Sequence, residues 1–263
     1  MIRPLADRRN HMHPAESLWQ SHHPPFDLPP GVLPVPTPIP GIAFFPGGFG
    51  LWRPDITQPL PPFPIGGVMI LGHDFHSETG YRESLARTRE SESQATWRQL
   101  LKLLAQVGVD PIDCFFTNVY LGLRAGSGTT GPFPGATDSR FVAYCLAFLR
   151  KQLAEQQPRL ILTLGVNVPP LIGQLAPQLA PWTECRHLKH LDAVGPVQFD
   201  VRFTDSTTHS ATVVALTHPS LRDGGVRHRR YRDRSGHLAE LQMLADALAH
   251  AGTIAPKHLD PHA

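Results

Sequence analysis

From residue 65 onward, short apolar runs alternate with longer segments of mixed polarity. Four of these runs are almost entirely apolar: 68–71, 114–120, 159–165 and 212–217. Continuous apolar runs of this length are typical of parallel strands that are buried on both faces. A further segment, 196–203, alternates between apolar and polar residues and predicts an additional strand at one edge of the sheet.

Three of the segments between these runs carry apolar residues at helical spacing and predict amphipathic helices. They span residues 94–107, 139–156 and 235–250. The polar segment 78–92 instead suits a solvated loop or a frayed helix. Strands that alternate with helices form a parallel sheet with helices on both faces. The pattern therefore predicts an α/β fold with three layers, α/β/α, around a central four-stranded, mostly parallel sheet.

The first quarter of the chain differs in composition. It holds more than half of the 28 prolines, which remove backbone donors and disfavour helix. We therefore expect residues 1–41 to form a largely disordered leader rich in proline and histidine. Residues 42–64, rich in proline and aromatic side chains, are expected to pack on the domain. The domain itself is expected at 65–252, with a tail at 253–263.

Composition narrows the function only slightly. The net charge of +2 is too small to indicate a nucleic-acid partner by itself, so local clusters of charge matter more. The three cysteines form no CxxC pair, which gives no support to a zinc or iron–sulfur site, and we expect no metal or cofactor. No apolar run is long enough to cross a bilayer. We expect a cytoplasmic, monomeric protein without membrane contact.

Polar side chains gather where the predicted strands end. Gly72 ends the first run and is followed by His73, Asp74 and His76, while Asn118 lies near the end of the second run. His218 follows the fourth run directly. Ligands of open α/β sheets bind just beyond the carboxyl ends of the strands. We therefore expect an acid, an amide and an imidazole to meet at one rim of the sheet.

Each of these residues also has a purely structural interpretation. Asp74 could cap the turn that follows it, because Asp is a common turn residue. Asn118 could bridge backbone groups at the end of its strand. His218 could be a buried, hydrogen-bonded histidine. The glycine-rich segment 125–135 lacks the lysine of a phosphate-binding loop and is expected to be a flexible wall of the pocket.

Three motifs resemble the uracil-DNA glycosylase superfamily. GHDFHS at 72–77 resembles the family's first motif, GQDPYH, and TNV at 117–119 resembles the strand that ends in its base-reading Asn. LTHPSLR at 216–222 resembles its final HPS motif, and RLILTLG at 159–165 falls where the family places its third strand. The resemblance covers roughly residues 65–250. It implies a uracil-DNA glycosylase-like fold and DNA as the partner.

The resemblance also implies a role for each matching residue. Asp74 would handle the hydrolytic water, Asn118 would read the uracil edge, and His218 would stabilise the departing base. Further substrate contacts are expected from Gly72, His73, Phe75, His76 and Ser220. The residues expected to bind DNA are Leu221, as a wedge in the base stack, and Arg222, Arg227, Arg229 and Arg230. The alternative for this run of charges is a solvated surface.

The sequence departs from the family pattern at several positions. Phe75 replaces the proline of the first motif, and His76 stands where the best-known branch has a tyrosine that blocks the methyl group of thymine. No residue clearly matches the phenylalanine that stacks on the base, although Tyr81 and Phe133 are candidates. These departures affect base selectivity more than the fold.

The chemistry of glycosidic cleavage suits these residue types. The sugar gains positive charge and the leaving base gains negative charge, so a carboxylate and a hydrogen-bond donor stabilise the transition state. The sequence therefore predicts a DNA glycosylase that removes uracil or a related deaminated base in base excision repair. One alternative is a catalytically weak or inactive module that binds nucleic acid or nucleotides. Another is an unrelated hydrolase of small nucleosides.

Overall fold

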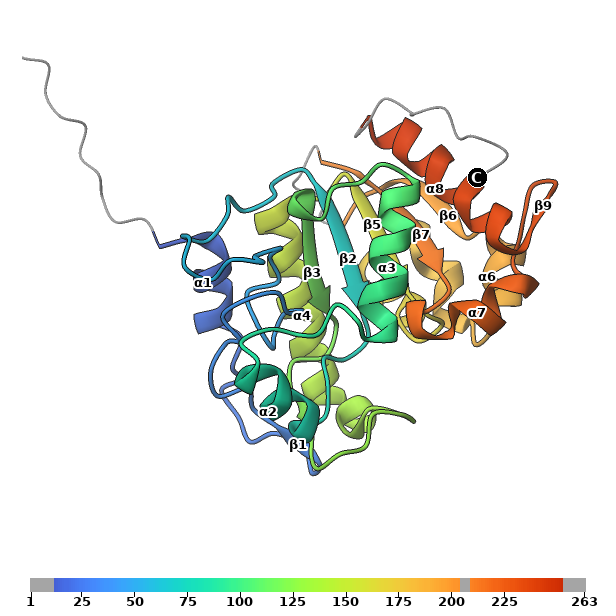
Figure 1. Cartoon of the computed structure of the whole chain (residues 1–263). Coiled ribbons are helices and arrows are strands. Elements are labelled where there is room, and N and C mark those ends of the chain that lie inside the picture. The colour runs from blue at the N-terminus through green and yellow to red at the C-terminus, as the bar shows by residue number, and fades with distance from the viewer. Residues whose placement is uncertain (1–11, 204–208, 253–263) are drawn as a thin grey trace, which may run out of the picture.

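The computed structural model describes residues 12–203 and 209–252 of the 263-residue chain. The predicted ends 1–11 and 253–263 lie outside the described residues. At the centre is a five-stranded sheet with the order β3-β2-β5-β7-β6 (Figure 1). The first four of these strands are parallel, and β6 pairs with β7 in the antiparallel direction. The α/β fold with a mostly parallel sheet is therefore as predicted.

The strands of the central sheet are β2 (Val68–Gly72), β3 (Cys114–Asn118), β5 (Leu160–Leu164), β6 (Val197–Val201) and β7 (Ala211–Leu216). Two small antiparallel pairs lie outside it, formed by β1 (Val32–Leu33) with β4 (Leu123–Arg124) and by β8 (Arg230–Tyr231) with β9 (Arg234–Ser235). The prediction of four strands in the sheet is corrected to five, because the alternating segment forms the edge strand β6.

The helices are α1 (Pro14–Gln20), α2 (Glu78–Ala86), α3 (Ala95–Gln106), α4 (Ser139–Gln156), α5 (Pro169–Ile172), α6 (Leu188–Val194), α7 (Arg222–Gly225) and α8 (Gly236–Ala251). The helix α4 begins where Asp138 accepts a hydrogen bond from the amide of Phe141, at 2.9 Å. Such a cap satisfies one of the free amides at a helix start. None of the helices in the described residues is long and apolar enough to cross a membrane.

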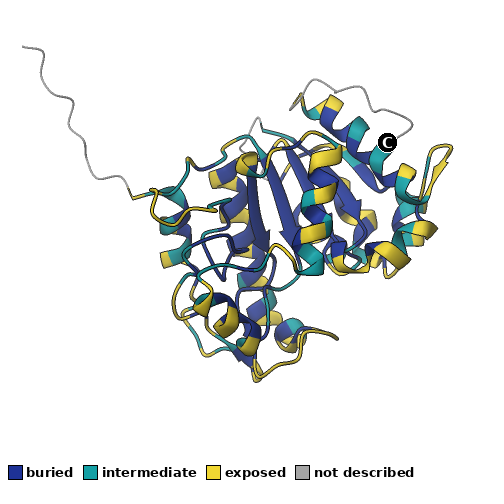
Figure 2. Ribbon diagram, viewed as in Figure 1, coloured by how far each residue is buried: buried dark blue, intermediate teal, exposed yellow. Residues whose placement is uncertain are grey.

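The sheet is covered on both faces, so the molecule has two apolar cores. On one face, β-strand residues such as Ile70 and Phe116 pack with Trp97 of α3 and Met243 of α8. On the other face, residues such as Phe115 pack against α4 and the short helices that follow β5. All residues of β2, β3, β5 and β7 are buried (Figure 2). This burial explains why these strands read as continuous apolar runs.

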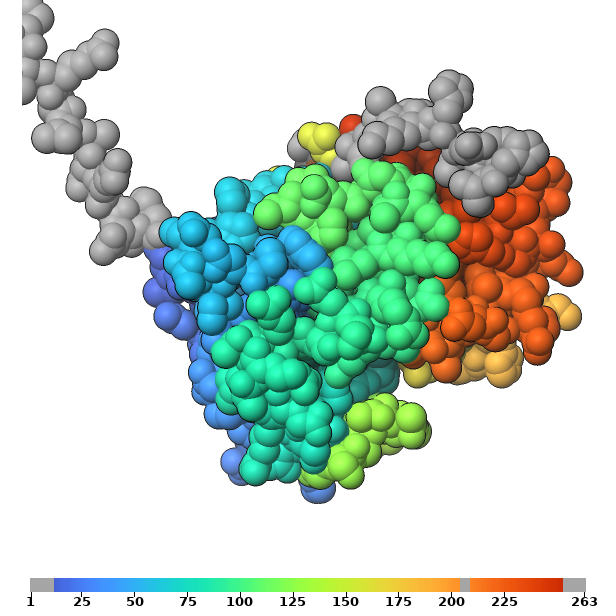
Figure 3. Space-filling model, viewed as in Figure 1, coloured from blue at the N-terminus to red at the C-terminus, as the bar shows by residue number. Residues whose placement is uncertain are grey.

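Residues 12–41 are not the disordered leader that their proline content predicts. Helix α1 buries Ala15 and Leu18 against the domain, and Val35 and Ile39 further along are also buried. Proline at the start of α1 is compatible with a helix because the first amides have no partner within the helix. The segment is therefore a folded covering of irregular structure, and its blue atoms form one surface with the rest of the domain (Figure 3).

The aromatic segment 41–52, which we call the N-terminal strap, lies along the outer edge of β3. The amide of Phe45 donates to the carbonyl of Phe116 at 2.9 Å, and the amide of Phe116 donates to Gly50 at 2.8 Å. The Phe45 ring stacks on Phe148 of α4 with 5.7 Å between the centroids. The strap therefore occupies backbone groups that an edge strand would otherwise leave unpaired.

Candidate active site

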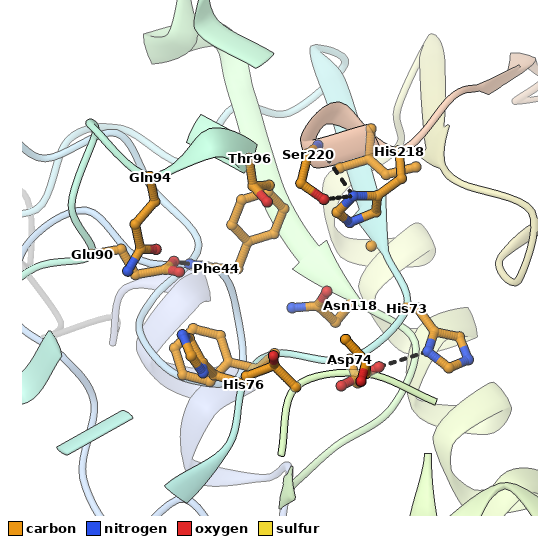
Figure 4. A pocket seen from close by; sticks show the side chains of 15 residues that line it. Phe44, His73, Asp74, His76, Glu90, Gln94, Thr96, Asn118, His218 and Ser220 are labelled. Atoms are coloured by element: carbon orange, nitrogen blue, oxygen red, sulfur yellow. Dashed lines mark hydrogen bonds and ion pairs between the residues drawn. The ribbon is translucent and has the colours of Figure 1, made fainter. Parts of the chain in front are cut away.

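A cavity of about 380 Å³ opens at the carboxyl edge of the sheet. Its lining comes from the ends of four strands (β2, β3, β5 and β7), the N-terminal strap, the segment between α2 and α3, the first turn of α3, and the glycine-rich loop. The lining residues are Phe44, Gly72, His73, Asp74, Phe75, His76, Glu90, Gln94, Thr96, Asn118, Thr129, Thr130, Leu164, His218 and Ser220 (Figure 4). A cavity of this size and polarity is suited to one small ligand.

The three residues expected to meet at the rim all line this cavity. Gly72 and Asn118 are direct partners in the parallel register of β2 and β3, and Asp74 follows two residues after the strand. His218 follows the end of β7, and the charge of Asp74 is close enough to act on its pKa. The topology of the sheet therefore brings together side chains that are far apart in the sequence.

Asp74 is held as a carboxylate by two basic side chains. His73 Nδ1 lies 2.6 Å from one oxygen, and the Arg124 guanidinium donates to both, over 2.7 and 3.0 Å. Burial by itself would raise the pKa of Asp74, but the hydrogen bonds from His73 and Arg124 outweigh it and lower the pKa to about 2. Asp74 is therefore ionised at any physiological pH.

Arg124, which the sequence analysis missed, also fixes the glycine-rich loop. Besides Asp74, its guanidinium donates to the carbonyls of Thr130, Gly131 and Pro132 over 3.0–3.2 Å. Its own position is set by β4, and its amide donates to the carbonyl of His76. The loop wall and the carboxylate are therefore positioned by one side chain. The only sequence signal was a lone arginine after an apolar run.

Asn118 is both a structural bridge and a lining residue. Its Nδ2 donates to the carbonyl of Phe45 at 2.9 Å, so part of the structural interpretation holds. Its Oδ1 accepts no hydrogen bond from the described residues and is available to a ligand N–H. A Cβ atom at Gly72 would stand 2.2 Å from this oxygen, so the close approach of β2 to Asn118 requires glycine. The amides of Val119 and Tyr120 occupy the carbonyls of Gly72 and His73.

The tautomer of His218 follows from its hydrogen bonds. The Ser220 amide donates to His218 Nδ1 at 3.3 Å, and the Ser220 hydroxyl lies 2.8 Å from the same nitrogen. Burial lowers the pKa of His218, partly offset by the charge of Asp74. The ring is therefore neutral at physiological pH with its proton on Nε2, which faces Asn118 in Figure 4. It can donate a hydrogen bond without being charged.

The two departures from the family motif have structural consequences. His76 packs its ring onto the backbone of Gly80, where a Cβ atom would stand 1.8 Å away. The Ser77 amide donates to His76 Nδ1 at 2.8 Å, and burial lowers the pKa of His76. Phe75 lies in the same way on Gly47 of the strap. Both side chains are fixed in the pocket wall.

The aromatic rings that line the pocket differ from those expected. Tyr81 is 3% exposed and donates its hydroxyl to the carbonyl of Thr37. Phe133 is stacked on Tyr120 within the core at 4.7 Å between the centroids. Neither lines the pocket, whereas Phe44 of the strap does. The prediction for Tyr81 and Phe133 is corrected accordingly. Phe44 was missed in the sequence, where the aromatic richness of the strap was the only signal that could have led to it.

Comparison with known protein families decides the identity of the domain. The sequence model of the uracil DNA glycosylase superfamily matches residues 68–235. The chain belongs to the uracil DNA glycosylase superfamily. No curated protein matches it at a significant level. Members of the superfamily are usually N-glycosylases that act on DNA.

For a superfamily member, the surface beside the pocket is where a DNA strand would lie. Leu221, next to the pocket residue Ser220, is 67% exposed, the largest exposure among the large hydrophobic residues described. Arg227 and Arg230 are also exposed. All three side chains are therefore accessible at the surface.

Arg222 and Arg229, by contrast, are interior residues, which corrects the expectation that they bind DNA. The Arg229 side chain is fully buried and donates to Asp192, Glu240 and the carbonyl of Ala215 over 2.8–2.9 Å. Arg222 pairs with the same Glu240 and with His237. Their guanidinium groups are engaged inside the fold and are not accessible to phosphates.

This buried network also holds the strand end that carries His218. Glu240 of α8 accepts a hydrogen bond from the amide of Thr217 at 2.7 Å, in addition to its two arginine partners. Thr217 directly precedes His218. The ion network therefore fixes the backbone directly before His218, where the HPS segment begins. In the described ranges, no group of three or more His, Cys, Asp or Glu side chains is arranged to hold a metal ion.

Proposed function

We propose that this protein is a DNA glycosylase that hydrolyses the N-glycosidic bond of uracil or a related deaminated base. The observation that carries the proposal is the convergence of Asp74, Asn118 and His218 on one cavity at the sheet edge. Membership of the superfamily supports it. A base stacked in a duplex has to be flipped out to reach such a cavity, which costs a few kcal/mol.

Each residue contributes at the point where charge develops. The Asp74 carboxylate stabilises the positive sugar and orients the attacking water. His218 donates its Nε2 proton in a hydrogen bond to a carbonyl oxygen of the departing anionic base. Asn118 accepts a hydrogen bond from the base through Oδ1, which is free for this purpose. Phe44 offers a ring face for stacking, which adds specificity for a planar ligand.

Contacts around these residues complete the proposed site. The carbonyls of Gly72 and His73 are already used, and the parallel register of β2 with β3 also engages the Gly72 N–H. Gly72 therefore gives the base room for close approach, and the backbone donor is the His73 N–H. Phe75 and His76 form the wall beside the base, and Ser220 orients His218. Leu221 fills the space that the flipped base leaves in the stack. Arg227 and Arg230 contact phosphates and add affinity that falls with salt.

The test is base excision from a single-stranded uracil oligonucleotide, detected as strand cleavage by alkali. Asp74→Asn keeps the size of the side chain but removes its charge, and we expect the excision rate to fall by about 10²–10³-fold, as for loss of one preorganised charge contact. Asp27→Asn, at an exposed carboxylate, is the matched control and should keep the wild-type rate. Equal rates in the wild type and Asp74→Asn would contradict the proposal.

One observation favours a second candidate, a binding module that lacks catalysis. Both oxygens of Asp74 are engaged by Arg124, which partly neutralises the carboxylate that the reaction would need. The same experiment separates the two candidates. Specific binding of the uracil oligonucleotide without any abasic product would support the module. Activity on free nucleosides alone would instead indicate a small-molecule hydrolase.

A further inference from the structure

One carboxyl group in the pocket has no part in the chemistry proposed above. Glu90 lines the cavity at the end opposite Asp74 and His218, with Gln94 beside it (Figure 4). It is only 6% exposed. Its amide donates to the carbonyl of Ile42 in the strap at 2.7 Å, so its backbone is fixed. Glu90 is therefore a rigid component of the pocket rather than a flexible surface acid.

The two oxygens of Glu90 have different surroundings. Oε2 accepts a hydrogen bond from the amide of Phe44 at 2.8 Å. Oε1 accepts no hydrogen bond of normal geometry from the described residues. The indole N–H of Trp97, which has no such partner either, lies near the carboxyl group and favours its ionised form. When the Glu90 carboxyl group is protonated, Oε2, which accepts the backbone N–H, serves as its carbonyl oxygen. The hydroxyl is then on Oε1, the oxygen left free for a ligand.

No positive side chain is placed to neutralise Glu90. No lysine or arginine of the described residues lines the cavity, and its titratable lining groups besides Glu90 are His73, Asp74, His76 and His218. From its own segment, Arg89 pairs with Glu92 at the surface over 3.9 Å. The neighbours that the strap and α3 place next to the Glu90 carboxyl group include Phe44 and Trp97, which are both uncharged. Burial consequently raises the pKa of Glu90 to about 7, despite the lowering effect of the Phe44 amide and Trp97.

We propose that the protonated carboxyl of Glu90 is a second recognition group of the pocket, whose hydroxyl donates a hydrogen bond to a carbonyl oxygen of the bound base. This inference rests on the proposed glycosylase function. No proton is transferred, because Glu90 keeps its hydrogen throughout. The ligand class is a planar base with an exocyclic carbonyl, the group that deamination creates.

The consequence is a dependence of recognition on pH. A neutral carboxyl donates to the base and stabilises the negative charge that develops as the base leaves. An ionised Glu90 offers no donor and repels that negative charge across a low-dielectric cavity. Recognition of the base is therefore lost as pH rises through the range in which Glu90 ionises.

The experiment compares excision of uracil from a single-stranded oligonucleotide between pH 5.5 and 9 in wild type and Glu90→Gln. Glutamine keeps an oxygen for the Phe44 amide and an N–H donor for the base, but it does not ionise. We expect kcat/KM of the wild type to fall about tenfold for each pH unit above about 7. The ratio of kcat/KM of Glu90→Gln to kcat/KM of the wild type should rise by the same factor. Glu92→Gln, at an exposed position of the same segment, is the control and should show the pH profile of the wild type.

A second measurement separates failure of this inference from failure of the proposed function. Asp74→Asn and the double variant Asp74→Asn/Glu90→Gln are titrated with oligonucleotides with and without uracil over the same pH range. A preference for uracil that weakens above about pH 7 only when Glu90 is present supports the inference, even if the wild type excises nothing. The inference is overturned if kcat/KM of Glu90→Gln declines at alkaline pH as it does in the wild type. It is also overturned if neither Asp74→Asn nor the double variant binds the uracil oligonucleotide in preference to the one without uracil at any pH.

Discussion

The two carboxyl groups that line the pocket differ in almost every respect. Asp74 lies between a histidine and an arginine, and its pKa is lowered to about 2. Glu90 has a backbone amide and aromatic rings for neighbours, and burial raises its pKa to about 7. Near neutral pH, Asp74 is always charged. Glu90 titrates in this range and is largely protonated below about pH 7. Two acids with pKa values pushed apart by their surroundings can take opposite roles in one site.

The difference teaches that burial alone does not decide the state of an acid. Both side chains are mostly buried, and in both cases burial raises the pKa. The pKa of Asp74 is low only because the hydrogen bonds from His73 and from the bidentate Arg124 outweigh that effect. The partner, rather than the depth, therefore separates the two acids, and changes to the partners are the strongest test of the comparison.

The largest effect is expected from Arg124→Ala. Removing one member of a buried ion pair leaves the other charge uncompensated and costs about 3–5 kcal/mol of the free energy of unfolding. The pKa of Asp74 should rise at the same time, because its arginine partner is gone and only His73 still lowers it. Urea denaturation gives the first quantity, and the acid limb of the excision rate gives the second.

Arg82→Ala is the matched control for this prediction. Arg82 pairs with Glu78 at 2.6 Å, but its side chain is 73% exposed. Exposed pairs contribute about 0–1 kcal/mol. Similar losses of stability in Arg82→Ala and Arg124→Ala would show that Arg124 is not the buried partner described here.

A smaller effect is expected from Glu90→Gln on stability at alkaline pH. Folding raises the pKa of Glu90 from 4.5 to about 7, so the folded state binds its proton more tightly than the unfolded state. Stability therefore falls as pH rises from about 4.5 to about 7, by about 3 kcal/mol at 1.36 kcal/mol per pKa unit. Denaturant unfolding at pH 5 and pH 8.5 should show this fall in the wild type and a smaller one in Glu90→Gln. Parallel pH profiles would refute it.

The smallest effect is expected from Asp74 at acid pH. Its pKa is lowered from 3.8 to about 2, so its stabilising contribution is complete above about pH 4 and is lost as pH falls toward 2. The loss amounts to about 2 kcal/mol. In acid titrations followed by circular dichroism, Asp74→Asn should lose less stability over this interval than the wild type. Glu90→Gln should not differ from wild type there, because Glu90 is already protonated.

The sequence predicted the part of the site that depends on strand ends. Asn118 and His218 end or follow buried apolar runs, and parallel strands place such ends at one edge. This argument needs only periodicity and topology. The same holds for helix α4, whose predicted and observed bounds agree at 139–156.

The rest of the site depends on contacts that no local pattern encodes. Phe44 and Glu90 are 46 residues apart, and each lines the pocket only because the strap pairs with the segment after α2. A proline-rich stretch and a charged stretch both favour exposed chain in the sequence. Their burial follows from tertiary packing, which overrides such local preferences.

The arginine run 227–230 is a second case in which the sequence does not predict which side chains are buried. Arg227 and Arg230 are exposed, but Arg229 between them is fully buried. Sequence alone gives the three arginines the same character. What separates them is the orientation of a short turn toward Asp192 and Glu240, which lie 37 residues before Arg229 and 11 residues after it.

The N-terminal strap and helix α8 both lie beyond the limits of the family match, 68–235. The segment that matches the superfamily is therefore shorter than the unit that folds in this protein. A fragment cut at the limits of that match would leave the outer edge of β3 uncovered and would lose Phe44, the carbonyl that holds Asn118, and the glutamate behind His218. Expression trials on this protein should therefore keep residues 12–252 together, since a trimmed fragment would invite edge-to-edge self-association.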